Sequence, residues 1–248
     1  MHPAFVRTDH RPFPLPAGEW VGRQSWHDLL FAHWPVPAAV LQEFVPAVLE
    51  IQAFEGTSWV GLLPFGMRDV ALRGMPALPW LSAFPEINLR LYVEYRGRPG
   101  IWFISLDASR ALAVWAARTF VHLPYFLAHM KLERAGSCVH YSSVRDKARD
   151  AAFEASYWPT GTAREAKKGS LEYFLTERYA LYSQAPDGRL WTVDIHHQPW
   201  PLQPAAADLR VNTVASAQGL PPLAGTPLLH FSRRQDVATW PPRLASRM

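Results

Sequence analysis

The chain has 248 residues, 49% of them apolar, and can bury a substantial core; we expect one domain over residues 1–240 and a flexible tail at 241–248. Its only cysteine, Cys138, excludes an intramolecular disulfide and a thiolate metal cluster, and its formal charge of +4 comes from arginines spread along the chain, so we expect no nucleic-acid partner. Because no apolar run approaches a membrane span and the proline-rich start has no signal-peptide stretch, we expect a cytoplasmic protein with no membrane contact.

The first half of the chain predicts strands separated by proline and glycine, without the regular strand and helix alternation of a doubly wound parallel sheet. Residues 21–34 mix the two periods and are either a strand or a short helix. Apolar residues at helical spacing between Pro37 and Pro46 predict a short helix. The next strands are expected at 59–63, 85–95 and 101–106, with residues 96–100 as a hairpin turn between the last two.

The second half predicts two more short helices and further strands. Ser109 is expected to cap the first helix, which ends before His122, and the second covers residues 171–176 with one apolar stripe. The strands are expected at 126–131, 138–145, 153–158, 178–182 and 190–196. Eleven tryptophans and 23 prolines suggest a large aromatic core crossed by irregular connections. The fold class that fits is mainly β (α+β), with a closed or nearly closed antiparallel barrel and a few covering helices.

The common signatures of enzyme and metal sites are absent from the sequence. It contains no Gly-rich dinucleotide motif, no P-loop, no nucleophile elbow and no zinc-protease motif. The only histidine cluster is His196-His197, close to Asp194, and a metal site there would need a distant third ligand such as His33. We favour hydrogen-bonded histidines at a strand end, and we expect neither a metal nor a cofactor.

The segment from Phe84 to Val93 alternates between two very different faces. Read as a strand, it sends polar side chains to one side and aliphatic side chains to the other; the polar members are Glu86, Asn88, Arg90 and Tyr92. The aliphatic face must pack on a core. The polar face either meets water or lines an interior that receives a ligand, and alternation alone leaves both readings open.

Several segments in chain order resemble the bacterial DUF2071 family, also called YqjF-like. The resemblance covers nearly the whole chain and rests on these segments together: Leu29 to Pro35, Val60 to Phe65, Phe84 to Arg90, Gly100 to Asp107, Ala117-Arg118 with Leu123-Pro124-Tyr125, and Thr176 to Tyr179 with His197 to Trp200. That family is functionally uncharacterised and is thought to share the acetoacetate decarboxylase-like fold. The resemblance therefore implies an antiparallel β-barrel with outer helices and an internal pocket.

The resemblance also implies where the chain departs from the decarboxylases. Their pocket glutamate would correspond to Glu86, whereas the position of their Schiff-base lysine appears here as Tyr125. Schiff-base chemistry needs a neutral amine, and a phenol cannot form the iminium. Lys131 shares strand parity with Tyr125 and is the remaining lysine that could reach the same pocket, although a turn follows it almost at once.

The polar residues suggest specific roles if they line a pocket. Glu86 is the candidate general base and Tyr125 the candidate hydrogen-bond donor, so these two are the candidate catalytic residues. A guanidinium can hold a carboxylate through two parallel hydrogen bonds, and the candidate binding residues are Arg90, Asn88, Arg118, Arg145 and His33. Glu86 and Arg90 lie about 13 Å apart along an extended strand, too far for a direct pair.

Three functions follow from these residues. The first is a protein that binds a small organic acid, a keto or enol acid, and acts on it by acid/base chemistry that needs no lysine. The second is a binding or sensing module without turnover. The third is a Schiff-base decarboxylase that uses Lys131. In each case the expected partner is a small carboxylate, and the sequence leaves the oligomeric state open.

Overall fold

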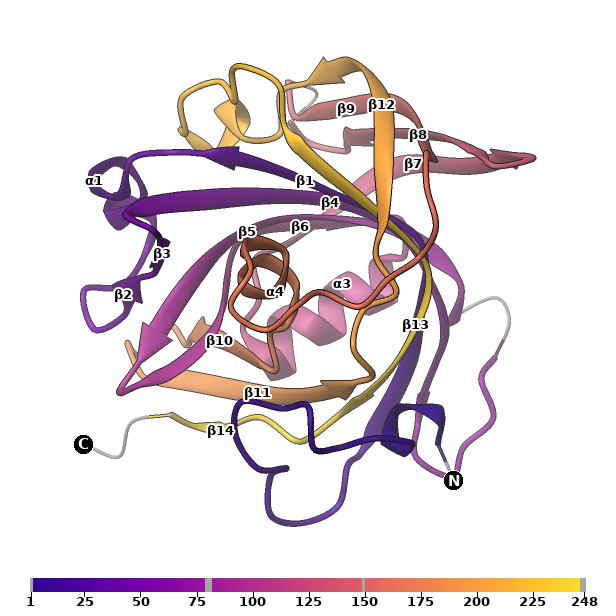
Figure 1. Ribbon diagram of the computed structural model, residues 1–248. Helices are drawn as coiled ribbons and strands as arrows, with labels where there is room; N and C mark the ends of the chain where they lie inside the picture. The colour runs from indigo at the N-terminus through magenta and orange to yellow at the C-terminus, as the bar shows by residue number, and fades with distance from the viewer. Residues whose placement is uncertain (1, 79–81, 149, 246–248) are drawn as a thin grey trace.

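The computed structural model describes residues 2–78, 82–148 and 150–245 and is dominated by one large sheet (Figure 1). Seven of its strands follow one another by hydrogen-bonded pairing until the last, β13, pairs again with the first. In pairing order these strands are β1 (Gly22–Pro35), β4 (Thr57–Leu72), β5 (Phe84–Tyr95), β6 (Arg98–Ala108), β10 (Ala180–Gln184), β11 (Leu190–His197) and β13 (Leu228–Thr239). The prediction of a mainly β fold is confirmed.

A second group of strands connects the end of β6 to the start of β13. It consists of β7 (Tyr125–Ala135), β8 (Cys138–Arg145), β9 (Ala152–Pro159) and β12 (Gln203–Asn212). In Figure 1 these strands lie above the others, at the upper right of the molecule. The sheet thus divides at β6, whose first residues pair with β10 and whose last residues pair with β7.

Both of those pairings are parallel, so the expectation of a purely antiparallel sheet is wrong at β6. Parallel neighbours need a crossover of a dozen or more residues, because the chain must return to the same end of the sheet. Residues 109–124 supply this crossover between β6 and β7 and contain α3 (Ala111–Ala116) and the π-helical turn η3 (Ala117–Val121). Arg110, not Ser109, is the N-cap of α3 and makes no side-chain capping bond.

The other short elements surround this sheet. They are η1 (Pro3–Phe5), α1 (Ala38–Leu41), η2 (Gln42–Phe44), β2 (Glu50–Ile51), β3 (Ala53–Phe54), α4 (Leu171–Thr176), η4 (Ser216–Gln218) and β14 (Arg243–Leu244). The predicted helix at 171–176 has the bounds of α4, and its stripe of Leu171, Phe174 and Leu175 packs in one apolar cluster. The segment 21–34, left open between helix and strand, is β1.

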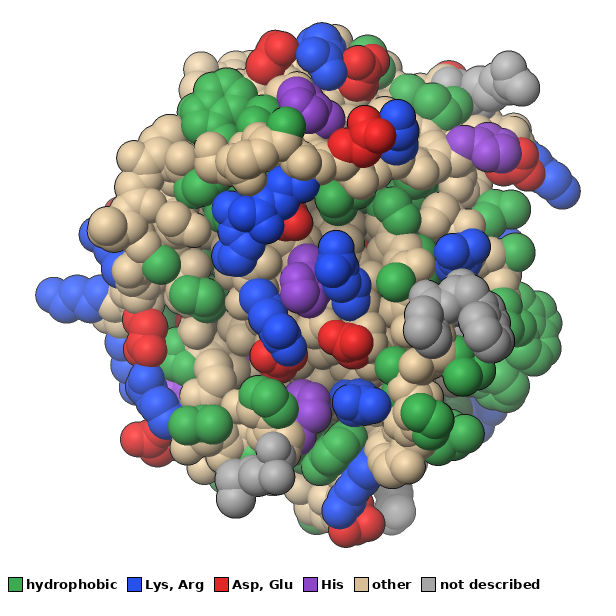
Figure 2. Space-filling view, turned by 90° about the vertical axis from the view of Figure 1, so that its right-hand side faces the viewer, with side chains coloured by type: hydrophobic (Ala, Val, Ile, Leu, Met, Phe, Trp, Pro, Cys, Tyr) green, Lys and Arg blue, Asp and Glu red, His purple; other side chains and the backbone are tan. Residues whose placement is uncertain are grey.

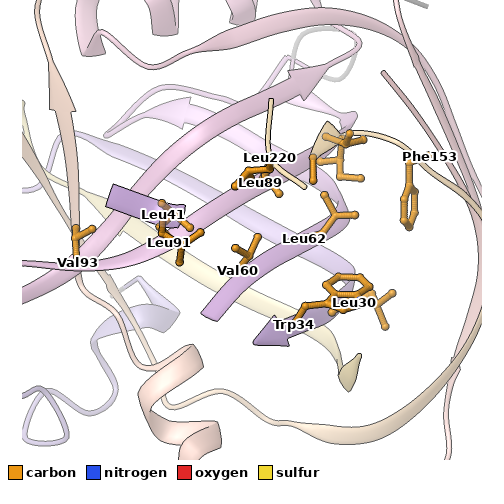
Figure 3. Packing of buried hydrophobic residues seen from close by; sticks show 14 of the residues in the cluster. Leu30, Trp34, Leu41, Val60, Leu62, Leu89, Leu91, Val93, Phe153 and Leu220 are labelled. Atoms are coloured by element: carbon orange, nitrogen blue, oxygen red, sulfur yellow. The ribbon is translucent and has the colours of Figure 1, made fainter. Parts of the chain in front are cut away.

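The aliphatic face of β5 packs on the core as its alternation predicts. Leu89, Leu91 and Val93 lie against Val60 and Leu62 of the adjacent strand β4 (Figure 3), and all five side chains are buried. The turn after β5 has positive φ at both Arg96 and Gly97, as a tight hairpin turn requires, so the predicted hairpin is confirmed. The polar face of β5 must therefore look away from this core.

Two of the longer strands, the short strands β2 and β3 and part of the tail were not predicted. The residues of β12 include a Pro-Ala-Ala-Ala run of low strand propensity, and β13 carries several charged side chains, so neither shows a strand period. The expected flexible tail is wrong for residues 241–245, because β14 pairs with β11 and Arg243 forms an ion pair with the buried Asp194 at 3.0 Å. Residues 246–248 lie outside the described residues.

Charges of both signs are distributed over the surface. Figure 2 shows one face on which Lys and Arg side chains are interspersed with Asp, Glu and His. Exposed arginines such as Arg7 and Arg210 pair with carboxylates, those of Glu165 and Glu154, at 2.8 and 3.0 Å. Within the described ranges, no helix is long and apolar enough to cross a membrane.

Candidate functional site

A cavity of about 320 Å³ is lined by side chains from β1, β4, β5, β6 and β11, and its walls are mostly apolar. The polar face of β5 looks into this cavity, because Glu86, Asn88 and Arg90 all line it. Tyr125, the first residue of β7, lines it as well. The structure thus brings four of the seven candidate residues from the sequence to one site.

Glu86 and Tyr125 form a buried hydrogen-bonded pair at this site. The Tyr125 hydroxyl donates to Oε2 of Glu86 at 3.0 Å. Burial raises the pKa of Glu86 to about 8, although the Tyr125 hydroxyl and the Asn88 amide act in the opposite direction. Burial and the neighbouring Glu86 carboxylate raise the pKa of Tyr125 well above its usual value. Near neutral pH the carboxyl group is therefore mostly protonated and can serve as a hydrogen-bond donor.

Asn88 lies between Glu86 and Arg90 on β5. Its Oδ1 atom is buried and has no hydrogen-bond partner among the described residues. Its neighbours across the two pairings are Leu63 of β4 and Leu106 of β6, which also line the cavity. A buried amide oxygen without a partner is costly, so a water molecule or a donor group of a ligand would be favoured here.

Arg90 is buried at the other end of this row. Its Nη2 atom donates to the backbone carbonyl of Leu175 at 2.9 Å and to the Tyr92 hydroxyl at 3.2 Å. The same hydroxyl makes a 2.5 Å hydrogen bond with Nε2 of His33. His33 is fully buried and is not part of the described cavity lining, so it is not placed to contact a ligand as expected. It instead holds the Tyr92 hydroxyl that accepts a hydrogen bond from Arg90.

Arg178 is a cavity residue that the sequence did not single out as a site. It follows α4, its Nε atom donates to the carbonyl of Phe174 at 2.7 Å, and its Nη1 atom donates to the side chain of Gln52 at 2.5 Å. Burial lowers the pKa of Arg178 to about 10. Arg178 belongs to the motif Thr176 to Tyr179, which contributed to the family resemblance. The sequence did not identify it as a site residue, because adjacent Glu and Arg residues usually form a surface ion pair.

The two arginines of the cavity share an unusual electrostatic position. Arg90 is 8% exposed and Arg178 is 6% exposed, yet neither has a carboxylate within ion-pair distance in the described part of the chain. Their hydrogen bonds go to carbonyl, amide and hydroxyl groups instead. The Glu94 carboxylate reaches Arg178 through the Gln52 amide, but it contacts neither guanidinium directly. Buried cations without a directly contacting carboxylate are costly, and an anion in the cavity would provide that contact for both.

Two other arginines predicted to bind an anion lie elsewhere. Arg118, in η3, is exposed and is not part of the cavity lining in the described chain. Arg145 is buried but points to Asp107, with Nη2 and Oδ1 2.7 Å apart, and its guanidinium stacks on Phe126. This ion pair with Asp107 occupies the Arg145 guanidinium, which is therefore not free to bind a ligand.

All four lysines are exposed, and the cavity lining contains none within the described ranges. Lys131, the candidate for Schiff-base chemistry, is 68% exposed and pairs with Glu133 at 2.9 Å. Lys131 shares strand parity with Tyr125, but it does not reach the cavity. Tyr125 is the first residue of β7, and Lys131 lies six residues farther along the strand, near the turn that follows it. The structure thus contradicts a pocket position for Lys131.

The histidine cluster separates into two environments. His197 lines the cavity and bonds to the carbonyls of Gln198 and Arg178, and burial lowers its pKa to about 4. His196 stacks on His10, and burial lowers its pKa to about 3. Both rings are thus neutral near neutral pH. The described residues contain no group of three or more His, Cys, Asp or Glu side chains placed to hold a metal ion.

The fold is similar to the folds of proteins whose structures have been solved. It matches the enduracididine biosynthesis enzyme MppR complexed with pyruvate, with a TM-score of 0.65 and 14% identity over 95% of this chain and 93% of that one. It also matches the acetoacetate decarboxylase of Legionella pneumophila, with a TM-score of 0.64 and 14% identity over 99% and 96% of the two chains. At this identity the likeness shows the acetoacetate decarboxylase-like fold alone.

The sequence itself has a much closer relative. The uncharacterized protein YqjF of Bacillus subtilis (strain 168) is 48% identical over 237 residues, which cover 96% of this chain and 98% of that protein. The model of the DUF2071 family, described as an uncharacterized conserved protein, matches residues 23–236. These residues include every strand of the seven-strand path except the last three residues of β13 and the first residue of β1. The chain therefore belongs to the DUF2071 family.

Proposed function

We propose that this protein binds a small organic acid, a keto or enol acid, in the cavity, with the carboxylate held by Arg90 and Arg178. The observation that carries the proposal is that both guanidinium groups are buried against the cavity without an acidic partner in the described chain. A carboxylate would supply the missing negative charge and accept their free N–H groups. The enzyme MppR, which shares the fold, forms a complex with pyruvate, a small keto acid.

Glu86 supplies acid/base chemistry to such a ligand. A carboxyl group with a pKa of about 8 is present in both protonation states around neutral pH, so it can take a proton from the carbon next to a carbonyl and return it. The Tyr125 hydroxyl keeps the carboxyl oriented. Enolisation needs no amine, which fits a cavity whose described lining lacks lysine.

The binding step is tested by calorimetric titration of a panel of keto acids. We expect Arg178→Gln to weaken binding about ten-fold or more, because it removes a charge-assisted contact. Arg118→Gln is the matched control, since Arg118 is exposed and outside the lining. Equal affinities of the two variants would contradict the carboxylate site.

The chemical step is tested by exchange of the ligand's C–H protons for deuterium, followed by NMR. We expect the wild-type protein to catalyse exchange next to the carbonyl, and Glu86→Gln to abolish it while binding is retained. Binding without exchange by the wild-type protein would instead support the non-catalytic binding module, because the same carboxylate contacts would then serve recognition alone.

A further inference from the structure

The polar groups of the cavity are separated into two ends. β4 and β5 pair without a register shift from Met67–Phe84 to Val60–Leu91, and the shift between Leu89 and Arg90 in the β5–β6 pairing places the extra residue, Ile104, on β6, so the β5 residues themselves run in regular succession across the site. Glu86 and Arg90 are four residues apart on this regular strand, which places their Cα atoms about 13 Å apart. One end of the cavity thus carries the carboxyl group and the other carries the guanidinium groups.

The side chains at these two ends do not converge. The Arg90 guanidinium donates to the hydroxyl of Tyr92, two residues farther from Glu86, and to the carbonyl of Leu175. Glu86 is held in place by Tyr125. Besides burial, the Asp107 carboxylate raises the pKa of Glu86. A ligand that touches both ends must therefore be extended.

The wall between the two ends is mostly apolar. Leu63 and Leu106 flank Asn88 on the two neighbouring strands, and Phe103 lies beside Arg90 across the β5–β6 pairing. These three side chains line the cavity. The cavity volume of about 320 Å³ is roughly that of ten water molecules in the liquid, far more than a carboxylate and an adjacent carbonyl need. The space between the polar ends suits a hydrocarbon chain.

We propose that the ligand is an extended oxo acid: Arg90 and Arg178 hold its carboxylate, an aliphatic spacer lies along Leu63 and Leu106, and the Glu86 carboxyl donates a hydrogen bond to a carbonyl remote from the carboxylate. This inference rests on the proposed function and narrows its ligand class. It separates the ligand from 2-oxo acids such as pyruvate, in which the two groups are adjacent. A short acid can satisfy one end of the cavity and leaves the other unoccupied.

The test is calorimetric titration of the full chain near neutral pH with four acids: pyruvate, levulinate, 6-oxoheptanoate and heptanoate. We expect affinity to rise from pyruvate through levulinate to 6-oxoheptanoate, with about ten-fold or more between the first and the last. We expect 6-oxoheptanoate to exceed heptanoate by about ten-fold, because only the former accepts the remote hydrogen bond. The ligand comparison uses the wild-type protein, so it does not depend on a variant that folds.

Two variants assign the remote contact to Glu86. Glu86→Leu removes the donor and should abolish the preference for 6-oxoheptanoate over heptanoate. Glu86→Gln keeps a donor in its amide group and should retain most of that preference. If pyruvate binds as tightly as 6-oxoheptanoate, or if Glu86→Leu keeps the preference, the inference is overturned while the proposed function stands. If no acid of the panel binds, the proposed function itself fails.

Discussion

Some buried ionisable side chains of this protein form ion pairs with each other, and others have only neutral partners. The first kind stabilises the fold, and the second kind contains the candidate functional residues. Asp107 and Arg145 satisfy each other inside the fold at 2.7 Å. Arg90 and Arg178 have only neutral partners among the described residues, and Glu86 has Tyr125 as its hydrogen-bonding partner. Two charges that neutralise each other in an ion pair are not available to a ligand. A buried charge without such a partner remains available to bind one.

The raised pKa of Glu86 makes a prediction about stability and pH. The unfolded chain releases this proton at about pH 4.5, whereas the folded protein retains it up to about pH 8. The contribution of the protonated group is therefore fully present below pH 4.5 and is lost as the pH rises through about 8. We expect a loss on the order of 1.4 kcal/mol per pH unit within this window.

Glu86→Gln should remove this slope, because its amide does not titrate. The measurement is urea unfolding of both proteins across the window between pH 4.5 and 8 without ligand, with the free energies of unfolding compared as a difference. A constant difference between the two proteins at all pH values would show that Glu86 is not a titrating buried acid.

The buried ion pair between Asp107 and Arg145 should contribute strongly to stability. Asp107→Asn leaves the Arg145 guanidinium buried without a counter-charge, and we expect a destabilisation of roughly 3–5 kcal/mol. The matched control is Glu154→Gln, because the Arg210–Glu154 pair is about half exposed on both sides and should contribute less than about 1 kcal/mol. Denaturant unfolding checks both, and equal losses would refute the distinction.

Among the secondary-structure elements, the short helix α4 positions the end of the cavity at which we propose that a carboxylate binds. The last-turn carbonyls of Phe174 and Leu175 accept hydrogen bonds from Arg178 and Arg90, which satisfies groups that a helix end leaves without internal partners. Ser170 is the N-cap of the helix, and its Oγ accepts from the backbone N–H of Tyr173 at 3.3 Å. The conformation of six residues thus fixes both guanidinium groups.

Removal of this cap should affect both stability and binding. We expect Ser170→Ala to destabilise the protein by about 1 kcal/mol, and to weaken acid binding because the last turn no longer holds the arginines as firmly. Ser170→Asp should restore both properties, since Asp also caps helices. Thermal unfolding and calorimetric titration measure the two effects. If Ala and Asp behave alike, the cap does not support the site.

At the scale of the whole molecule, the fold places every lysine away from the cavity. Lys131, Lys147, Lys167 and Lys168 are all exposed, and Tyr125 stands where the family resemblance expects the amine. We therefore expect borohydride reduction in the presence of a β-keto acid to give no site-specific lysine adduct. Intact mass followed by peptide mapping checks this, with Lys131→Met as the control. A single adduct at Lys131 that the control loses would revive the decarboxylase.

The two-faced pattern of β5 and the mainly β fold class could both be predicted from the amino-acid sequence. Side-chain alternation is a local property of an extended chain, so Glu86, Asn88 and Arg90 had to share one face, and the aliphatic face had to find a core. The absence of a lysine at the position of Tyr125 is likewise a fact of the sequence. Turn residues and aliphatic runs placed most strands, because both act over a few residues.

Which charged side chains meet depends on contacts between distant segments of the chain. Strand periodicity cannot say that Arg145 finds Asp107, that Arg118 stays on the surface, or that α4 brings Arg178 beside Arg90, since these contacts depend on segments far apart in the chain. The same reason explains the missed β12 and β13: their residues have weak strand preferences and become strands through pairing with β9 and β1. Local preference fixed the direction of a side chain, and long-range pairing fixed its partner.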